Sequence, residues 1–132
     1  EVQGLHWMTP IVHEGNLYAF SGRNEPDASF RCVEFATGKL LWNQDEAWQK
    51  YGPPSNKYGR GSFIQADGKL IVLGETGKLG LFALNAKKPE ELAAYQVPQL
   101  RYPCWAAPAM ADKRVYLRSE AYLVCYDFAK ER

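Results

Sequence analysis

The chain has 132 residues, which suits one domain, and 46% of them are apolar, enough for a hydrophobic core. No run of 18 apolar residues occurs, which excludes a membrane-spanning helix, and residues 1–5 lack the basic start and apolar stretch of a signal peptide. The 16 Lys and Arg nearly balance the 15 Asp and Glu, which argues against the basic stripe of a nucleic-acid-binding protein.

Three segments repeat one pattern, in which a short turn separates two apolar stretches. They read TPIVHEGNLYAF at 9–20, SFIQADGKLIVL at 62–73 and APAMADKRVYLR at 107–118. The turns contain Glu14, Asp67 and Asp112, and an acidic residue followed by Gly between β-rich runs is a strong hairpin signal. The third turn has Lys113 where the other two have Gly, so its hairpin signal is the weakest of the three.

A third apolar stretch follows each predicted hairpin. These stretches read FRCVEF at 30–35, LGLFAL at 79–84 and LVCYDF at 123–128. In this register Cys32, Leu81 and Cys125 are equivalent. The acidic turn residues are 53 and 45 residues apart, and periods near this length, with several strands in each unit, are typical of propeller blades.

The outer part of each unit varies. The first unit continues with ATGKLLW at 36–42, where Thr37 and Gly38 predict a tight turn that leads into an outer strand ending near Trp42. In the second unit Pro89 could begin a helical turn, but the repeat favours a strand over 92–97, in which Tyr95 takes the role of Trp42. The third unit ends before an outer strand.

The segment 36–42 resembles the tail of the repeat in quinoprotein-like propellers, the pyrroloquinoline-quinone type, which reads roughly Asp-Ala-x-Thr-Gly-Lys-x-x-Trp. The repeat is similar to that of the outer-membrane assembly lipoprotein BamB, and the chain looks like a C-terminal fragment of such a protein. The resemblance implies that Trp42 docks between neighbouring blades, where burial is worth about 2–3 kcal/mol. It also implies a periplasmic, cell-envelope or secreted location.

We therefore predict an all-β fold, a partial β-propeller of about three antiparallel four-stranded blades with the last blade incomplete. The blade-like units span about 5–46, 59–98 and 104–130 of a single propeller segment (1–132), and 47–58, rich in Gly and Pro, is a loop linker. Because propeller rings have about four to eight blades, three blades leave two flanks open. The expected partners are further copies of the chain, which would self-associate through these flanks, or missing blades of a longer parent; a separate protein partner is also open.

The cysteines and histidines offer little chemistry. Cys32, Cys104 and Cys125 are an odd number without a Cys-x-x-Cys pair, so we interpret at least two of them as small buried hydrophobes and leave a disulfide open. His6 and His13 lie seven residues apart on one strand region, and we expect a structural role and no metal site.

Two groups of residues are candidates for binding a ligand or partner. Trp7, Arg60 and Trp105 are equivalent in the repeat and precede the first strand of each unit, so they could line one mouth of a central channel and bind a sugar or an anion. The alternative is that both Trp side chains pack between blades. The loop 22–27 carries Arg23, Asn24, Glu25 and Asp27 together, or is a solvated hairpin tip.

No catalytic residues are recognisable. We expect a non-catalytic segment that acts as a protein-interaction or ligand-binding scaffold in an exported bacterial protein. The alternative is that the chain is part of a quinone-dependent dehydrogenase whose cofactor residues lie on missing blades. Pyrroloquinoline quinone and calcium would then bind only to the full-length parent, since this chain lacks the adjacent cysteines of the alcohol dehydrogenases of this type.

Overall fold

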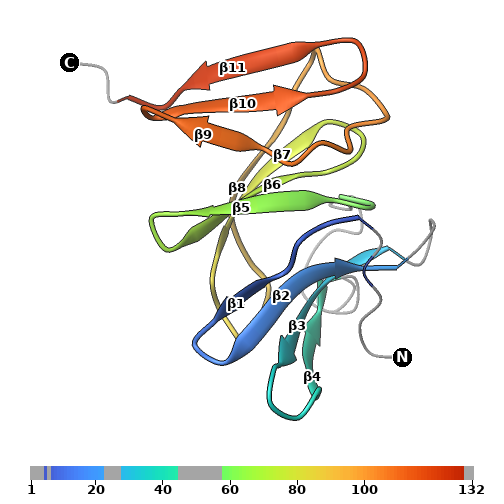
Figure 1. Ribbon diagram of the computed structural model, residues 1–132, viewed down its shortest axis with the longest axis vertical. Coiled ribbons are helices and arrows are strands. Elements are labelled where there is room, and N and C mark those ends of the chain that lie inside the picture. The colour runs from blue at the N-terminus through green and yellow to red at the C-terminus, as the bar shows by residue number, and fades with distance from the viewer. Residues whose placement is uncertain (1–4, 6, 23–27, 45–57, 130–132) are drawn as a thin grey trace.

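The computed structural model describes residues 5, 7–22, 28–44 and 58–129. They form three antiparallel β-sheets that lie side by side in chain order (Figure 1). The first sheet has strands β1 (Ile11–His13), β2 (Asn16–Ser21), β3 (Ser29–Glu34) and β4 (Leu40–Asn43). The second has β5 (Ser62–Ala66), β6 (Lys69–Leu73), β7 (Lys78–Ala83) and β8 (Glu90–Gln96), and the third has β9 (Ala109–Ala111), β10 (Arg114–Arg118) and β11 (Leu123–Asp127).

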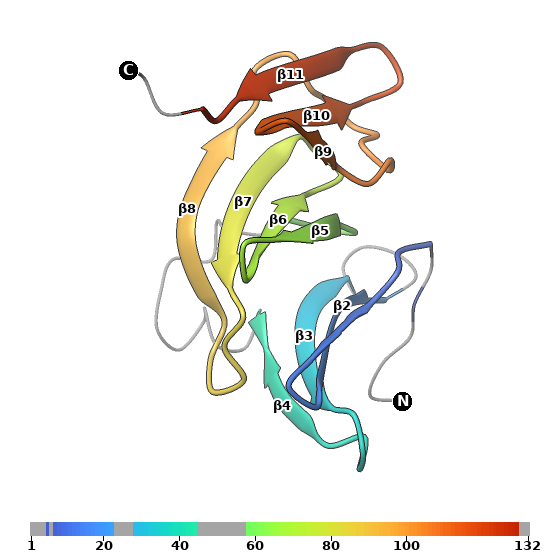
Figure 2. The same cartoon turned by 60° about the vertical axis from the view of Figure 1, so that its left-hand side comes forward.

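The strands of each sheet follow one another in space as they do in sequence. The all-β prediction is thus confirmed, as are the four, four and three strands of the successive units. Figure 2 shows the fourth strands, β4 and β8, along one side of the stack. Within the described residues no helix is long and apolar enough to span a membrane. The predicted linker at 47–58 falls outside these residues, except for Tyr58.

All three predicted hairpins are present and have the same turn. Glu14, Asp67 and Asp112 have φ values of 49°, 49° and 48°, and Gly15 and Gly68 follow with φ of 77° and 66°. Two positive φ values in a two-residue loop define the type I′ turn, whose twist matches that of the flanking strands. Lys113 adopts the same backbone, with φ 63°, although it has a side chain where the other turns have Gly.

The repeat register is confirmed by strand pairing. Cys32 lies opposite Tyr18, Leu81 opposite Ile71, and Cys125 opposite Tyr116. The partners occupy equivalent positions of the three hairpins, so one alignment describes all three sheets.

The second unit ends in a strand and not in a helical turn, because β8 begins at Glu90. The predicted match between Tyr95 and Trp42 is wrong. Trp42 lies opposite Cys32 and Ala93 lies opposite Leu81, so Ala93 occupies the position of Trp42. Tyr95 lies two residues further along the same face, is 51% exposed, and its ring meets that of Tyr126 on the third sheet edge to face at 6.2 Å.

An aromatic core joins the first and second sheets. Phe30 packs edge to face against Phe82 of β7 at 5.2 Å and against Trp42 at 5.1 Å. Trp42 is buried, and its indole N–H donates a 2.8 Å hydrogen bond to the carbonyl oxygen of Asn85, which follows β7. The expected docking of Trp42 between neighbouring sheets is therefore observed. Tyr58 lies directly over Gly80, where any side chain would collide with its ring.

An aliphatic core joins the second and third sheets. Its buried members include Ile71 and Leu73 from β6 and Val115 and Leu117 from β10. The alternation along β6 explains this arrangement, since Leu70 and Val72 point to the first sheet and Ile71 and Leu73 to the third. The second sheet is thus apolar on both faces because it is covered on both.

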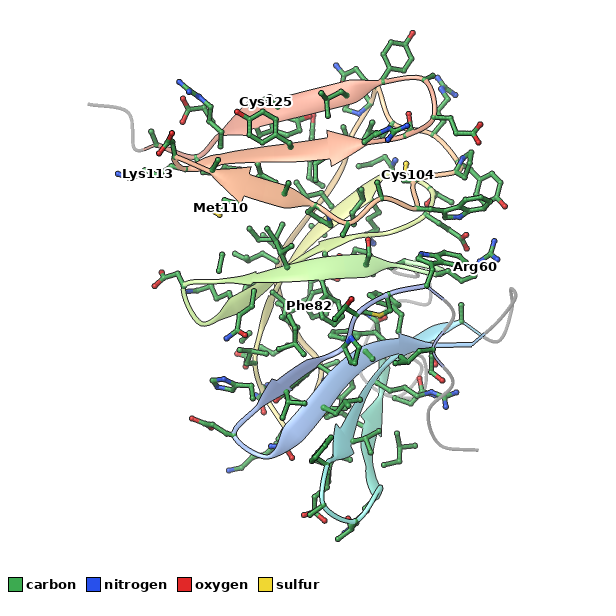
Figure 3. The ribbon with its side chains drawn as sticks, in the orientation of Figure 1. Arg60, Phe82, Cys104, Met110, Lys113 and Cys125 are labelled. Atoms are coloured by element: carbon green, nitrogen blue, oxygen red, sulfur yellow. The ribbon has the colours of Figure 1, made fainter. Side chains whose placement is uncertain are left out.

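The three cysteines have different environments. Cys32 and Cys104 are buried, which agrees with their interpretation as small hydrophobes, and burial raises the pKa of Cys32 to about 11. Cys125 is exposed although it occupies the position of Cys32. The reason is that the second sheet covers Cys32, whereas no sheet of the described chain covers the outer side of β11 (Figure 3). All three thiols are free.

Lys113→Gly should raise the free energy of unfolding by up to about 1 kcal/mol, because Gly adopts positive φ without the clash that a Cβ atom causes. The reverse exchange, Gly68→Lys, should lower it by about 1 kcal/mol. At Gly68 no atom lies within 4 Å of the position of a Cβ, so this control measures the backbone alone. Urea denaturation measures both changes, and equal stabilities of Lys113→Gly and the parent chain would contradict the turn assignment.

With a thiol reagent at pH 8 we expect one fast reaction per folded chain, at Cys125. Cys32 and Cys104 should react only when the chain opens, because burial blocks access and raises the pKa of both thiols. Absorbance of the released thiolate follows the reaction. Cys125→Ser should abolish the fast phase, and a fast phase that survives this substitution would show that a buried thiol is accessible.

Candidate functional site

Trp7, Arg60 and Trp105, which precede the first strands of the three sheets, come together as the repeat predicts. The two indole rings lie 5.5 Å apart between centroids, with their planes tilted by 50°. The guanidinium carbon of Arg60 lies 4.9 Å from the Trp7 ring and 5.7 Å from the Trp105 ring. Arg60 lies at the end of the sheets opposite the Lys113 turn (Figure 3).

A buried carboxylate, Glu75, organises this cluster. It lies in the loop between β6 and β7, and its side chain has no exposed area. One oxygen accepts a 3.0 Å hydrogen bond from Nε of Arg60 and lies 3.0 Å from Nη2, and the other accepts the Arg60 backbone N–H at 3.1 Å. The indole N–H of Trp105 also donates to Glu75, at 3.4 Å. Glu75 therefore joins the second sheet to the segment that leads into the third.

Backbone hydrogen bonds hold Glu75 in this position. Its N–H donates to the carbonyl oxygen of Tyr58 at 3.1 Å, and its carbonyl oxygen accepts the N–H of Cys104 at 2.9 Å. Arg60 also donates to the hydroxyl of Tyr102 at 3.3 Å. The sequence predicted the three outer members of the cluster and missed Glu75, which had no motif around it.

The polar groups of the cluster bind one another. The carboxylate of Glu75 balances the charge of Arg60, and aromatic rings cover the guanidinium. A small pocket of about 10 Å³ adjoins Trp7 and Arg60 among the described residues, room for roughly one water. The guanidinium group that could bind a sugar or an anion is thus already bound by protein groups. The role of the three residues in ligand binding stays a prediction.

A second hollow, of about 190 Å³, opens beside Trp105. Its walls include Arg118, the last residue of β10, and Glu120, which follows that strand. Glu120 is the repeat equivalent of Glu75, and it is exposed where Glu75 is buried.

The other predicted residues divide into two groups. Arg23, Asn24, Glu25, Asp27 and His6 lie outside the described residues. Thr37 and Gly38 have the structural role expected of them. Gly38 has φ 73°, and the Thr37 hydroxyl donates to Glu34 and accepts the N–H of Lys39. His13 ends β1, next to Glu14 at 3.7 Å.

No three His, Cys, Asp or Glu side chains of the described residues gather as metal ligands.

The outer face of the third sheet is a further candidate that the site predictions did not name. Tyr116 and Cys125 lie on it, half-buried and exposed, at the positions of the buried Tyr18 and Cys32. The equivalence of Cys32 and Cys125 pointed to this face, but only the structure shows which side of each sheet has a neighbour.

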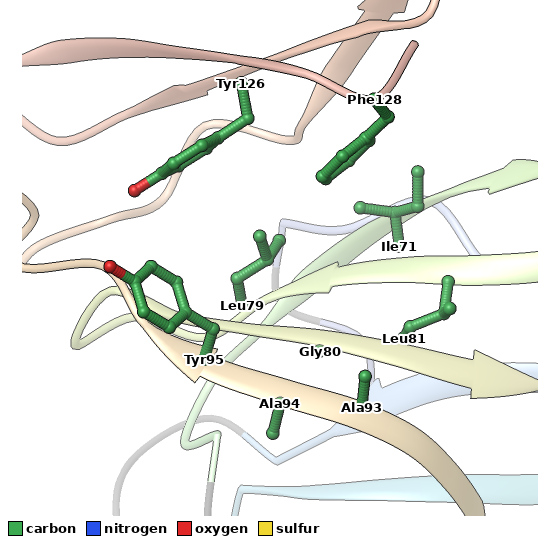
Figure 4. Close-up of a pocket in the computed structure, with 9 residues that line it drawn as sticks. All are labelled: Ile71, Leu79, Gly80, Leu81, Ala93, Ala94, Tyr95, Tyr126 and Phe128. Carbon is green, nitrogen blue, oxygen red and sulfur yellow. The ribbon is translucent and has the colours of Figure 1, made fainter. Parts of the chain in front are cut away.

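An apolar cleft of about 370 Å³ lies between the second and third sheets (Figure 4). Leu79 and Leu81 of β7 and Tyr95 of β8 form one side, and Tyr126 and Phe128 project towards them from the third sheet. Ala93 lines it as well, at the position where Trp42 fills the interface of the first two sheets. The cleft thus exists partly because a methyl group replaces an indole.

Comparisons with known proteins leave the family open. No protein-family model matches the chain, and no curated protein does. Among solved structures, the computationally designed Ika4 protein is similar over 96% of both chains, with 8% identity and a TM-score of 0.46. The computationally designed Ika8 protein is similar over 90% of this chain and 45% of its own, with 9% identity and a TM-score of 0.40. Similarities this weak carry no argument here.

Arg60→Met should lower the free energy of unfolding by about 3 kcal/mol, because it leaves the buried carboxylate of Glu75 without its countercharge. The double substitution Arg60→Met with Glu75→Leu should recover most of this loss, because no buried charge remains. Urea denaturation of both single variants and the double variant gives the coupling energy. Additive effects of the two substitutions would contradict the pairing of these groups.

Proposed function

We propose that the chain is a non-catalytic segment of a β-propeller, with the three sheets as blades, and that it acts as an interaction scaffold. In this proposal the sheets form a stack that binds further sheets of the same kind. We also propose that it belongs to an exported bacterial protein of the quinoprotein-like type. The resemblance of 36–42 to that repeat supports this last point.

The observation that carries the proposal is the difference in exposure between equivalent residues. Tyr18, Cys32 and Glu75 are buried by the sheet or segment that follows them. Among their equivalents, Tyr116 is half-buried, and Cys125 and Glu120 are exposed. The face repeats the Tyr and Cys of an internal interface and is open in the described chain, although Arg118 stands at the position of the buried Phe20. Such an open face is suited to a partner of the same shape.

The first sheet offers a complementary end. On the face turned away from the second sheet, Val12 and Leu40 are exposed, whereas Ala19 and Val33 on the same face are buried. Phe35 beyond β3 is 63% exposed. The internal contacts are head to tail, since the same side of each sheet meets the opposite side of the next. A second copy can therefore repeat this contact, and such heterologous contacts close into rings or continue as filaments.

The contact of Trp7, Arg60 and Trp105 supports a propeller arrangement. Each residue directly precedes the first strand of its sheet, so the inner ends of the sheets converge on one point. In a propeller, blades are arranged around a central axis in this way.

The isolated chain should self-associate, and Tyr116→Lys should weaken the association at least about tenfold, because it replaces the aromatic ring at the position of the buried Tyr18 by a charged side chain. Sedimentation velocity over a range of concentrations measures this. Leu92→Lys is the matched control, because Leu92 is an exposed leucine of β8 away from that face. Urea midpoints would show that both variants are folded.

A chain that remains monomeric at high concentration would overturn the proposed self-association, as would equal effects of the two substitutions. The reaction of Cys125 with the thiol reagent provides an independent readout, since association through the outer face should slow it with increasing protein concentration.

A further inference from the structure

The third sheet has an open strand edge. In the first two sheets the third strand pairs with a fourth, β3 with β4 and β7 with β8. The equivalent strand, β11, pairs only with β10 among the described residues. Leu123 at its start is 69% exposed, and Phe128 just beyond its end is 51% exposed.

The edge of β11 lacks the features that protect an outer strand. Sheet edges are commonly protected by bulges and charged side chains. Both β4 and β8 have a register irregularity against their neighbours, and β8 begins with Glu90 and Glu91. By contrast, β11 pairs with β10 in unbroken register from Leu123 to Asp127 and has no charge before Asp127. In these features β11 resembles an internal strand, which is paired on both sides.

The apolar cleft lies beside this edge. Tyr126 and Phe128 line it from β11 and the residues that follow, and Ala93 and Tyr95 line it from the outer strand β8 (Figure 4). A strand added to β11 would run over the cleft, and every second side chain would point into it, because side chains alternate between the faces of a strand. The Tyr95 and Tyr126 rings already meet edge to face, and such rings favour a further aromatic side chain.

We propose that the β11 edge and the adjoining cleft bind an extended peptide segment of a partner protein by strand addition. The segment pairs antiparallel with β11, as β4 does with β3 and β8 with β7, and it places aromatic side chains from alternate positions into the cleft. Backbone hydrogen bonds supply affinity, and the cleft supplies specificity. This site is distinct from the outer face that the proposed function uses, since it involves the edge and the inner face of the third sheet.

The test uses a fluorescein-labelled seven-residue peptide of alternating threonine and aromatic residues, and the full chain with Tyr116→Lys, so that self-association does not compete. Fluorescence anisotropy measures binding. Two derivatives carry N-methyl groups on the amides of one strand edge or of the other. In a strand of fixed direction only one edge faces β11, so one derivative should lose binding at least about tenfold and the other should keep it.

Ala93→Trp should fill the cleft and weaken binding of the peptide at least about tenfold. Leu92→Trp adds the same indole one residue away, outside the cleft-lining residues, and should leave the affinity unchanged. Absence of binding at millimolar peptide would overturn the proposal, as would equal binding of the two N-methylated derivatives or equal affinities of the two tryptophan variants. None of these outcomes depends on whether the outer face of the third sheet associates.

Discussion

A β-sheet that is apolar on both faces must be covered on both, and this constraint governs the molecule. The second sheet obeys it: Leu70 and Val72 of β6 are buried against the first sheet, and Ile71 and Leu73 are buried against the third. Four adjacent residues of one strand thus belong to two cores. The stack depends on this strand, since its removal would expose an apolar face on each neighbour.

The two interfaces solve the same packing problem differently. The interface of the first and second sheets is filled by rings, with Phe30 at its centre and Trp42 at its outer side. The interface of the second and third sheets is aliphatic, and at the position of Trp42 it has Ala93. An indole therefore fills this position in one interface, and an apolar cleft lies beside it in the other.

A buried ion pair, Arg60 with Glu75, lies at the end of the sheets opposite the Lys113 turn. Burial of a charge is costly unless a partner is present, and Glu75 meets this requirement through Arg60 and the surrounding N–H donors. Both members of the pair belong to the second unit, and the rings that lie against Arg60 come from its neighbours, Trp7 before the first sheet and Trp105 before the third. The cluster consequently forms only when the three units lie next to one another.

The sequence by itself determined the local structure and the repeat. Acidic–Gly dipeptides between apolar stretches favour hairpin turns, so the hairpins at Glu14 and Asp67 could be predicted. The repeat extended this prediction to Asp112 and to the equivalence of Cys32, Leu81 and Cys125. Even Lys113 obeys the repeat, because strand pairing on both sides outweighs its preference for negative φ.

Only the tertiary structure decided which faces are covered and which residues from distant units meet. Glu75 has no local signal, because its role depends on Arg60 fifteen residues earlier and Trp105 thirty residues later. Strand pairing decided that Ala93, and not Tyr95, matches Trp42. Both β4 and β8 carry a bulge at the equivalent place, but the connection that leads into β8 is longer, and the apolar pattern of the sequence does not reveal how such a connection sets the register. Cys32 and Cys125 occupy one repeat position, yet Cys32 is buried and Cys125 is exposed. The reason is that burial depends on whether a neighbouring sheet covers the residue and not on the strand itself.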